Sequence, residues 1–213
     1  MMEILSAYGG MLLKAIGVHT LYVIISVACG SLLGLGFGIL LSRAPRWSGI
    51  ILPIVSIFQT IPGLVFIGVL FLLLGMVPWT VIIALSVYAM FPVMKNTYTG
   101  ILEVDKGYVE AAKGCGMTAF QTLLQVELPL AMPTIIAGLR MAAVYTVSWT
   151  VLAAMIGLGG LGDLIYQGTS SNNNTLILLG AIPAAVLAIL IGGLIDRLQK
   201  KVTPRGLTKE AGK

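Results

Sequence analysis

Residues 110–129 read EAAKGCGMTAFQTLLQVELP and form a polar segment between two strongly apolar parts of the chain. Glu110, Ala111 and Ala112 come first, Gly116 follows after three further residues, and VELP closes the segment at positions 126–129. A polar segment of this length, in a chain that is otherwise built for lipid, is expected to meet a partner in water. Because alanine side chains are small, Ala111 and Ala112 would let another protein's surface approach the backbone closely.

The same region carries local signals for two short helices joined by a turn. Asp105 can cap a first helix, and Gly114 and Gly116 then supply a flexible break. Thr118 with Gln121 matches a capping box that begins a second helix. An amphipathic helix lying on the inner membrane surface is the alternative. The paired helix signals favour a two-helix elbow that docks on a partner.

The composition indicates an integral membrane protein. Hydrophobic residues make up 58% of the 213 and charged residues 10%, whereas soluble domains carry about 25% charged residues. The mean hydropathy is +1.01. The net charge of +5 does not indicate nucleic-acid binding, since the basic residues lie at membrane boundaries and form no patch. Residues 1–213 are therefore expected to form one transmembrane domain of the all-α class.

Apolar runs predict five membrane-spanning helices, since about 20 residues cross a bilayer. Residues 47–94 carry no charge, and the GMVP sequence at 75–78 divides this run into a hairpin of two spans. The predicted spans are residues 18–42, 50–74, 78–99, 135–157 and 175–196. A cytoplasmic loop covers about residues 101–133.

The positions of lysine and arginine predict the orientation, because basic residues are enriched in cytoplasmic loops. With the N-terminus outside and the C-terminus in the cytoplasm, twelve of the thirteen basic residues lie inside and only Lys14 lies outside. The reverse orientation would put the twelve outside. The favoured orientation also places residues 110–129 in the cytoplasm, where ATP is.

Two predicted spans carry small residues at every fourth position. They are Ser26, Gly30, Gly34 and Gly38 in the first span, and Gly180, Ala184, Ala188 and Gly192 in the last. Small residues at this spacing let transmembrane helices approach closely. Both faces are therefore expected to pack against other helices.

The second span contains a polar break that is a candidate for the transport path. Pro62 frees backbone carbonyl groups beside Gln59 and Thr60. Irregular backbone at membrane depth is tolerated only when it is buried in protein or faces a wet cavity. A kink that neighbouring helices satisfy explains the segment equally well.

The fourth span contributes a second candidate face for the path. Tyr145, Ser148 and Trp149 lie on one side of the helix, although aromatic residues in this arrangement are more often packing residues. His19, near the outer end of the first span, is expected at the membrane interface.

No enzyme signature is present. The chain lacks a GxxxxGK[ST] phosphate-binding loop and is not expected to bind ATP by itself in the usual way. One histidine and no paired carboxylates within a span argue against hydrolytic, redox and proton-relay chemistry. Cys29 and Cys115 have no metal-ligand spacing. No catalytic residue, metal site or cofactor is therefore predicted in this chain.

Residues 110–129 resemble the cytoplasmic EAA loop of ABC-importer permeases, in which an alanine-rich helix docks into a groove on the ATPase subunit. Val126 stands where the usual residue is isoleucine. The resemblance implies a type I ABC importer permease fold. It also implies that the elbow couples to the ATPase through Glu110, Ala111, Ala112, Gly114, Gly116, Met117 and Thr118.

Further segments resemble the permeases of osmoprotectant importers, which take up glycine betaine, carnitine, choline and related solutes. They are QTIP at 59–62, NTYTGI at 96–101, KGCGMT at 113–118, ELPLA at 127–131, AGLR at 137–140, GLGGLGD at 157–163 and VTPRGL at 202–207. The resemblance implies a multi-pass subunit of the bacterial inner or plasma membrane. Its implied partners are cytoplasmic ATPase subunits that hold ATP and magnesium, a second identical or homologous permease, and a separate extracellular or periplasmic solute-binding protein.

Three other functions stay open on the sequence alone. A permease of a methionine-type or other amino-acid importer has a similar five-span size. A small channel or secondary carrier would need intramembrane charges or internal repeats, which the sequence does not show. A non-transporting assembly subunit would leave the EAA spacing unexplained.

Overall fold

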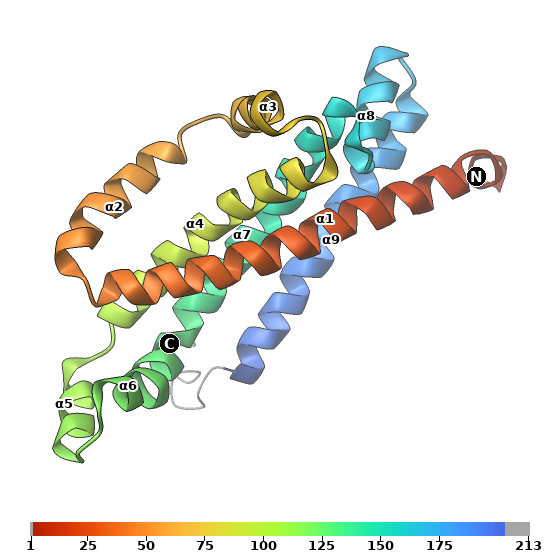
Figure 1. The fold of residues 1–213 in the computed structure, drawn as a ribbon. Coiled ribbons are helices and arrows are strands. Elements are labelled where there is room, and N and C mark those ends of the chain that lie inside the picture. The colour runs from red at the N-terminus through yellow and green to blue at the C-terminus, as the bar shows by residue number, and fades with distance from the viewer. Residues whose placement is uncertain (1, 203–213) are drawn as a thin grey trace.

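The computed structural model describes residues 2–202, and these residues form helices without any strand among them. Four long helices make up the bundle: α1 (Met2–Ser42), α4 (Pro78–Leu102), α7 (Leu128–Ala153) and α9 (Asn174–Val202). Each contains a stretch long and apolar enough to cross a membrane. Figure 1 shows these helices running along one another, with the short helices at the two ends and along one side. The prediction of an all-α membrane protein is confirmed.

The second predicted span is broken into two helices. α2 (Pro45–Phe58) and α3 (Gly63–Leu74) are bent by 94° relative to each other at the residues between them. Neither helix reaches the 20 or so residues that a crossing needs. The pair therefore supplies a fifth crossing only if the two helices together count as one span.

Contacts between the long helices give their relative directions. α1 and α4 run parallel, because the glycines of α1 meet progressively later residues of α4. Gly30 packs against residues 86–90 of α4, Gly34 against residues 90–94 and Gly38 against residues 94–97. α7 runs antiparallel to α4, since Gly100 near the end of α4 packs against residues 131–134 of α7, while Gly138 of α7 packs against residues 92–96 of α4. α9 in turn runs antiparallel to α7, because Gln199 bonds to Pro133 and Asp196 pairs with Arg140.

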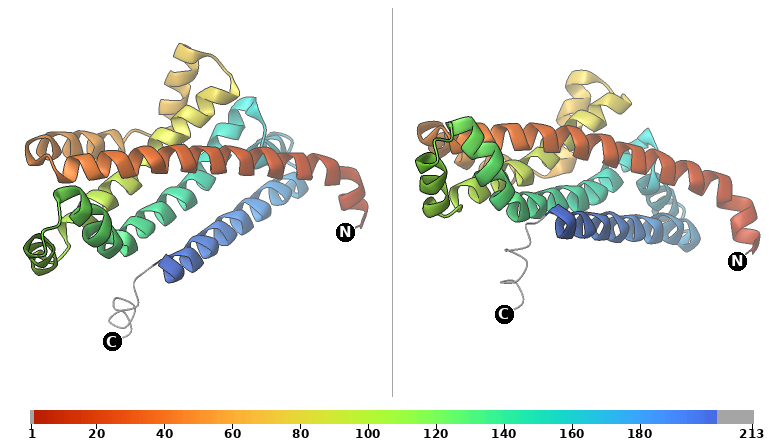
Figure 2. Two further views of the ribbon diagram at one scale, coloured as in Figure 1. Left: turned by 60° about the horizontal axis from the view of Figure 1, so that its bottom comes forward. Right: turned by 90° about the horizontal axis from the view of Figure 1, so that it is seen from below.

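These directions define the role of the bent pair. α1 and α4 end at the same end of the bundle, so α2 and α3 together carry the chain back to the other end (Figure 2). The start of α1 and the end of α9 consequently lie at opposite ends of the bundle. This course fits five crossings, as predicted, with the second crossing bent in the middle.

The small-residue face of α1 packs directly on α4, as expected. Ser26, Gly30, Gly34 and Gly38 are all buried, and a Cβ atom added at Gly34 would lie 2.6 Å from the carbonyl oxygen of Met90. Such a distance leaves no room for a side chain, so the glycines permit this close approach.

The small residues of α9 face two different neighbours. Gly180 packs on α8 (Leu161–Ser170), and Gly192 lies beside Val144 and Arg140 of α7. His19, expected at the membrane interface, is enclosed by protein. It is fully buried and lies near Gly160, the residue before α8. Its position near one end of a span gave no sign that α8 folds over it.

Candidate functional site

The polar segment after α4 folds into the predicted elbow. In α5 (Lys106–Gly114), the backbone N–H of Gly107 donates to Asp105 Oδ1 at 2.7 Å, which caps the first helix. The capping box of the second helix, α6 (Ala119–Thr122), is also present: Thr118 N donates to Gln121 Oε1 at 2.8 Å, and Gln121 N donates to Thr118 Oγ1 at 3.3 Å. Both caps are confirmed because they depend on residues only two or three positions apart.

Gly116 makes the turn between the two helices. Its φ of +80° lies in the left-handed region, which a residue with a Cβ atom adopts only at a cost. The backbone N–H of Met117 donates to the carbonyl oxygen of Ala112 at 3.1 Å and closes the turn.

The elbow presents most of the proposed coupling residues to its surroundings. Glu110, Ala111, Gly114, Gly116 and Thr118 are exposed, and Met117 is partly buried. Ala112 is different, because it is only 6% exposed and packs inside the elbow. Of the two alanines expected on a docking face, only Ala111 is therefore exposed.

The second half of the elbow is continuous with the membrane-spanning part. α6 passes through one π-helical turn, η1 (Leu123–Glu127), directly into α7. Single π-helical turns of this kind frequently occur at functional sites. The elbow is therefore joined to the bundle by a continuous helical stretch, Ala119–Ala153.

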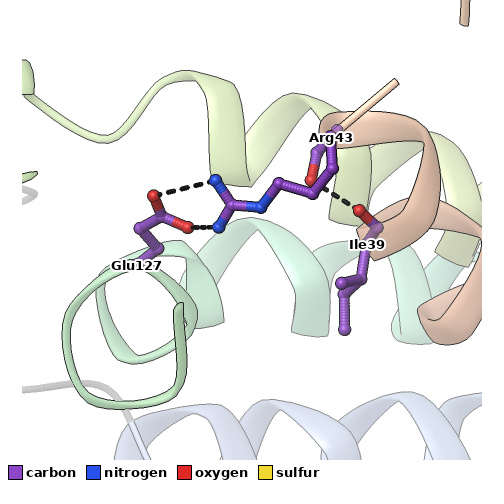
Figure 3. Close-up of polar contacts among 4 residues, drawn as sticks. Ile39, Arg43 and Glu127 are labelled. Atoms are coloured by element: carbon purple, nitrogen blue, oxygen red, sulfur yellow. Dashed lines mark hydrogen bonds and ion pairs between the residues drawn. The ribbon is translucent and has the colours of Figure 1, made fainter. Parts of the chain in front are cut away.

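An ion pair ties this junction to α1 (Figure 3). Arg43, just after α1, donates through both terminal nitrogens to the two carboxylate oxygens of Glu127, with Nη1 to Oε1 at 3.2 Å. The Glu127 side chain is 6% exposed and that of Arg43 is 46% exposed. This bidentate geometry holds the carboxylate in a fixed orientation. This pair was not predicted from the sequence, although an acidic residue within the apolar sequence VELP was a signal that it needed a partner.

A cavity of about 350 Å³ lies beside the bend between α2 and α3. Its lining residues come from that bend, from α4 and from α7: Gln59, Tyr88, Pro92, Lys95, Asn96, Met141, Tyr145, Thr146 and Trp149. Three of the path residues suggested by the sequence, Gln59, Tyr145 and Trp149, are thus brought together. Thr60, Pro62 and Ser148 are exposed and do not line this cavity.

Two aromatic residues of the cavity wall hold the bend in place. Tyr88 and Trp149 stack with their ring centroids 4.8 Å apart, and the Tyr88 hydroxyl donates to the carbonyl oxygen of Ile61 at 2.8 Å. A Cβ atom at Gly63 would overlap the Trp149 ring, so only glycine fits there. The two explanations of the break therefore apply together. A neighbouring helix bonds the Ile61 carbonyl group, and Gln59 lines a cavity.

The remaining polar residues of the cavity come from one turn of α4 and from α7. Asn96 Nδ2 donates to the Pro92 carbonyl oxygen at 2.8 Å, and Thr146 Oγ1 donates to the Ala142 carbonyl oxygen at 2.7 Å. Lys95 carries the only charge among the described residues that line the cavity. Tyr88, Lys95 and Asn96 were not predicted from the sequence, because Lys95 marks the end of an uncharged run and so looked like a boundary residue.

Comparisons with known proteins agree with this architecture. Residues 30–206 match the family model described as binding-protein-dependent transport system inner membrane component. The chain is 39% identical over 207 residues to the glycine betaine/carnitine/choline transport system permease protein OpuCB of Bacillus subtilis (strain 168), covering 97% of this chain and 95% of that protein. It is 37% identical over 189 residues to the carnitine transport permease protein OpuCB of Listeria monocytogenes, covering 89% and 87% of the two chains.

Solved structures share the fold. A chain of the MetNI methionine ABC transporter, in an inward-facing conformation, superposes with a TM-score of 0.84 at 23% identity, covering 93% of this chain and 99% of that one. A chain from an amino acid ABC transporter crystallised with histidines gives a TM-score of 0.76 at 19% identity, with 92% and 96% covered. These likenesses bear on the fold alone, and they confirm the predicted importer permease fold.

Proposed function

The chain belongs to the family of binding-protein-dependent transport system inner membrane components, and from this we propose that it is the transmembrane subunit of an ATP-driven importer of quaternary-ammonium osmoprotectants. The observation that carries the proposal is identity of about 39% over nearly the whole chain to permeases named for glycine betaine, carnitine and choline transport. Glycine betaine, carnitine and choline are therefore the first solutes to test.

The fold alone would equally support an amino-acid importer, because the solved structures that it resembles include methionine and amino acid transporters. Their identities to this chain are 23% and 19%, whereas two of the osmoprotectant permeases are 39% and 40% identical to it. The proposal therefore takes quaternary-ammonium solutes as the cargo and keeps methionine-type transport as the second candidate.

We assign ATPase coupling to the elbow of α5 and α6. Its exposed surface combines small Ala111 and charged Glu110 with two large aromatic side chains, Tyr108 at 59% and Phe120 at 68% exposure. Exposed apolar side chains of this size on a polar segment are typical of protein–protein contact sites. The elbow extends beyond the bundle at the end where α4 and α9 finish (Figure 2), which leaves it accessible to a partner.

The coupling mechanism in this proposal is mechanical. ATP and Mg²⁺ would be held by two partner ATPase subunits, whose closure on ATP moves the elbow. α6, η1 and α7 form one continuous path, so this displacement shifts α7, and the Arg43–Glu127 pair carries it to α1. Because Tyr145 and Trp149 belong to α7, the wall of the cavity moves with it. Such rigid-body changes switch a path between two accessible states without covalent chemistry in this subunit.

The cavity beside the bend is the proposed segment of the solute path. Gln59 and Trp149 line it within the chain, and a second permease, identical or homologous, would enclose it from the open side. A separate binding protein would deliver the solute to the outer end. In this arrangement the subunit lies in the bacterial inner or plasma membrane with the elbow and the C-terminus in the cytoplasm and the N-terminus outside.

The proposal is tested by reconstitution of the whole transporter. The chain is purified with the ATPase and, where required, a second permease, and is placed in vesicles together with the solute-binding protein. We expect accumulation of labelled glycine betaine, carnitine or choline only when ATP is present on the ATPase side. Uptake of methionine without uptake of these solutes would favour the second candidate, and uptake that does not need ATP would rule out both.

A further inference from the structure

The cavity beside the bend holds a single positive charge without a compensating acid. Among the described side chains, the ion pairs are Arg43–Glu127 and Arg140–Asp196, so Lys95 pairs with neither of their carboxylates. No aspartate or glutamate is found among the described residues that line the cavity. The Lys95 ammonium group is therefore available to an anionic group that enters the cavity.

Aromatic residues also line the cavity. Tyr88, Tyr145 and Trp149 line it, and the first and last of these stack on each other. Aromatic faces attract quaternary ammonium groups through the negative charge of the ring face. One cavity thus offers surfaces for two groups of opposite charge.

Tyr88 of the aromatic part and Lys95 lie on one side of α4, about two helical turns apart. Tyr88 and Lys95 lie seven positions apart on α4, which is about 10 Å along the axis at 1.5 Å per residue. The four-carbon stem of lysine can shorten this separation by leaning toward the aromatic residues. The volume of about 350 Å³ lies near the lower end of the range of roughly 300–1,000 Å³ for small-molecule sites, as expected for a compact solute.

We infer that this cavity favours quaternary-ammonium solutes that also carry a carboxylate over those that carry only the positive charge, and that Lys95 is the residue that sets this preference. A betaine-type zwitterion places its ammonium group against the aromatic residues and its carboxylate against Lys95. A cationic alcohol such as choline makes the first contact only, and Lys95 repels its charge. The inference rests on the proposed function, because it ranks solutes within the class proposed there.

Asn96 and Gln59 complete the cavity's polar surface. Asn96 uses one amide hydrogen for the Pro92 carbonyl group, so its second amide hydrogen can reach the carboxylate. Gln59 lines the cavity from the bend between α2 and α3, and its amide can accept from or donate to either kind of solute. Neither side chain carries charge, so the discrimination between zwitterion and cation falls to Lys95.

The test compares transport of glycine betaine and choline by the complete transporter, with one binding protein used throughout. Lys95→Met should lower the ratio of kcat/KM for glycine betaine to that for choline about tenfold, since a charge-assisted hydrogen bond is lost and the repulsion of choline is relieved. Lys95→Arg should keep the ratio near the wild-type value. Lys201→Met removes an exposed lysine of α9 that does not line the cavity, and it should leave both rates unchanged.

A second variant tests the inference without removing Lys95. Asn96→Asp adds a carboxylate to the cavity that Lys95 also lines. This negative charge repels the solute's carboxylate and attracts a cation, so the variant should shift the ratio toward choline. Unchanged ratios in Lys95→Met and Asn96→Asp, or equal losses for both solutes, would overturn the inference while the proposed function stands. A wild-type transporter that moves neither solute would overturn the proposed function and the inference together.

Discussion

Arg43 and Glu127 lie 84 positions apart in the sequence and form a bidentate ion pair that joins the end of α1 to the start of α7. Glu127 is the last residue of the π-helical turn between the elbow and the membrane-spanning part of the chain. The pair thus connects the segment proposed to contact the ATPase with α1, whose glycine face packs on α4. Its environment is asymmetric, with a buried carboxylate and a half-exposed guanidinium group.

This asymmetry predicts unequal effects of removing the two partners. Arg43→Gln leaves a carboxylate buried without its cation, so it should destabilise the subunit more than Glu127→Gln, which leaves a guanidinium group that water can reach. Arg43→Gln should lower the free energy of unfolding by more than the 0–1 kcal/mol or so that exposed pairs contribute. The loss should be smaller than the about 3–5 kcal/mol found for fully buried pairs. Thermal unfolding in detergent of both single variants and the double variant measures the coupling.

The Arg140–Asp196 pair supplies the control, because its two side chains are both about half exposed. Neutralising it should cost no more than about 1 kcal/mol. A coupling energy at Arg43–Glu127 as small as that of the control pair would mean that the junction is not held by the ion pair.

The bend between α2 and α3 depends on close packing at Gly63. Gly63→Ala would place a methyl group in the Trp149 ring. It should lower the free energy of unfolding by about 1–3 kcal/mol, as is typical of overpacking. Gly68→Ala is the matched control on the same helix, since a Cβ atom added there meets no neighbouring residue within 4 Å and alanine favours a helix. The measurement is the melting temperature of the purified subunit. Equal melting temperatures for the two variants would show that Trp149 moves away easily and does not fix the bend.

Gln59 tests the proposed path directly. Gln59→Leu keeps the approximate size of the side chain but removes its amide from the cavity, so solute uptake should fall severalfold while assembly with the ATPase persists. Ser56→Ala, one turn earlier on α2, alters an exposed hydroxyl that bonds only to its own helix and should leave uptake unchanged. Normal uptake by Gln59→Leu at normal expression would make the bend a structural feature alone.

The proposed orientation predicts where reporters are found. A reporter inserted at Asn173, in the turn between α8 and α9, should be external, and one fused after Lys213, which lies outside the described residues, should be cytoplasmic. The physical basis is the excess of basic residues at the elbow end of the bundle. Protease protection or reporter activity in intact cells provides the measurement. Both reporters on one side of the membrane would contradict the five-crossing course of the chain.

Features that depend on neighbouring residues could be predicted from the sequence. The Asp105 cap, the Thr118–Gln121 box and the small-residue face of α1 all follow from spacings of two to four positions, and the structure confirms each. The family resemblance gave the importer permease fold in the same way, through short matching segments.

Features that depend on tertiary contacts could not be predicted. Tyr88 and Trp149 stack although they are 61 positions apart in the sequence. The residues next to each of them in the sequence do not indicate this contact. The burial of Ala112 was missed because burial inside the elbow depends on how α5 folds back against η1 and α6, beyond the reach of a local pattern. The 94° bend was anticipated only as an interruption, since Pro62 indicates a break in a helix but not the angle.

The central claim is that the elbow transmits ATP hydrolysis to solute movement. Ala111→Trp puts a large side chain on the exposed docking face, and Gly116→Val adds strain at a φ of +80°. Both variants should keep the membrane-spanning helices intact, because the elbow lies outside them. Ala185→Trp, at an exposed alanine on α9, controls for the added bulk.

The decisive measurement is the amount of solute accumulated per ATP hydrolysed by the complete transporter in reconstituted vesicles, together with co-purification of the ATPase. We expect Ala111→Trp and Gly116→Val to lower this ratio or to lose the ATPase, while Ala185→Trp matches the wild type. Wild-type ratios and full ATPase association in both elbow variants would contradict the account, since residues 110–118 would then be a surface segment without a part in coupling.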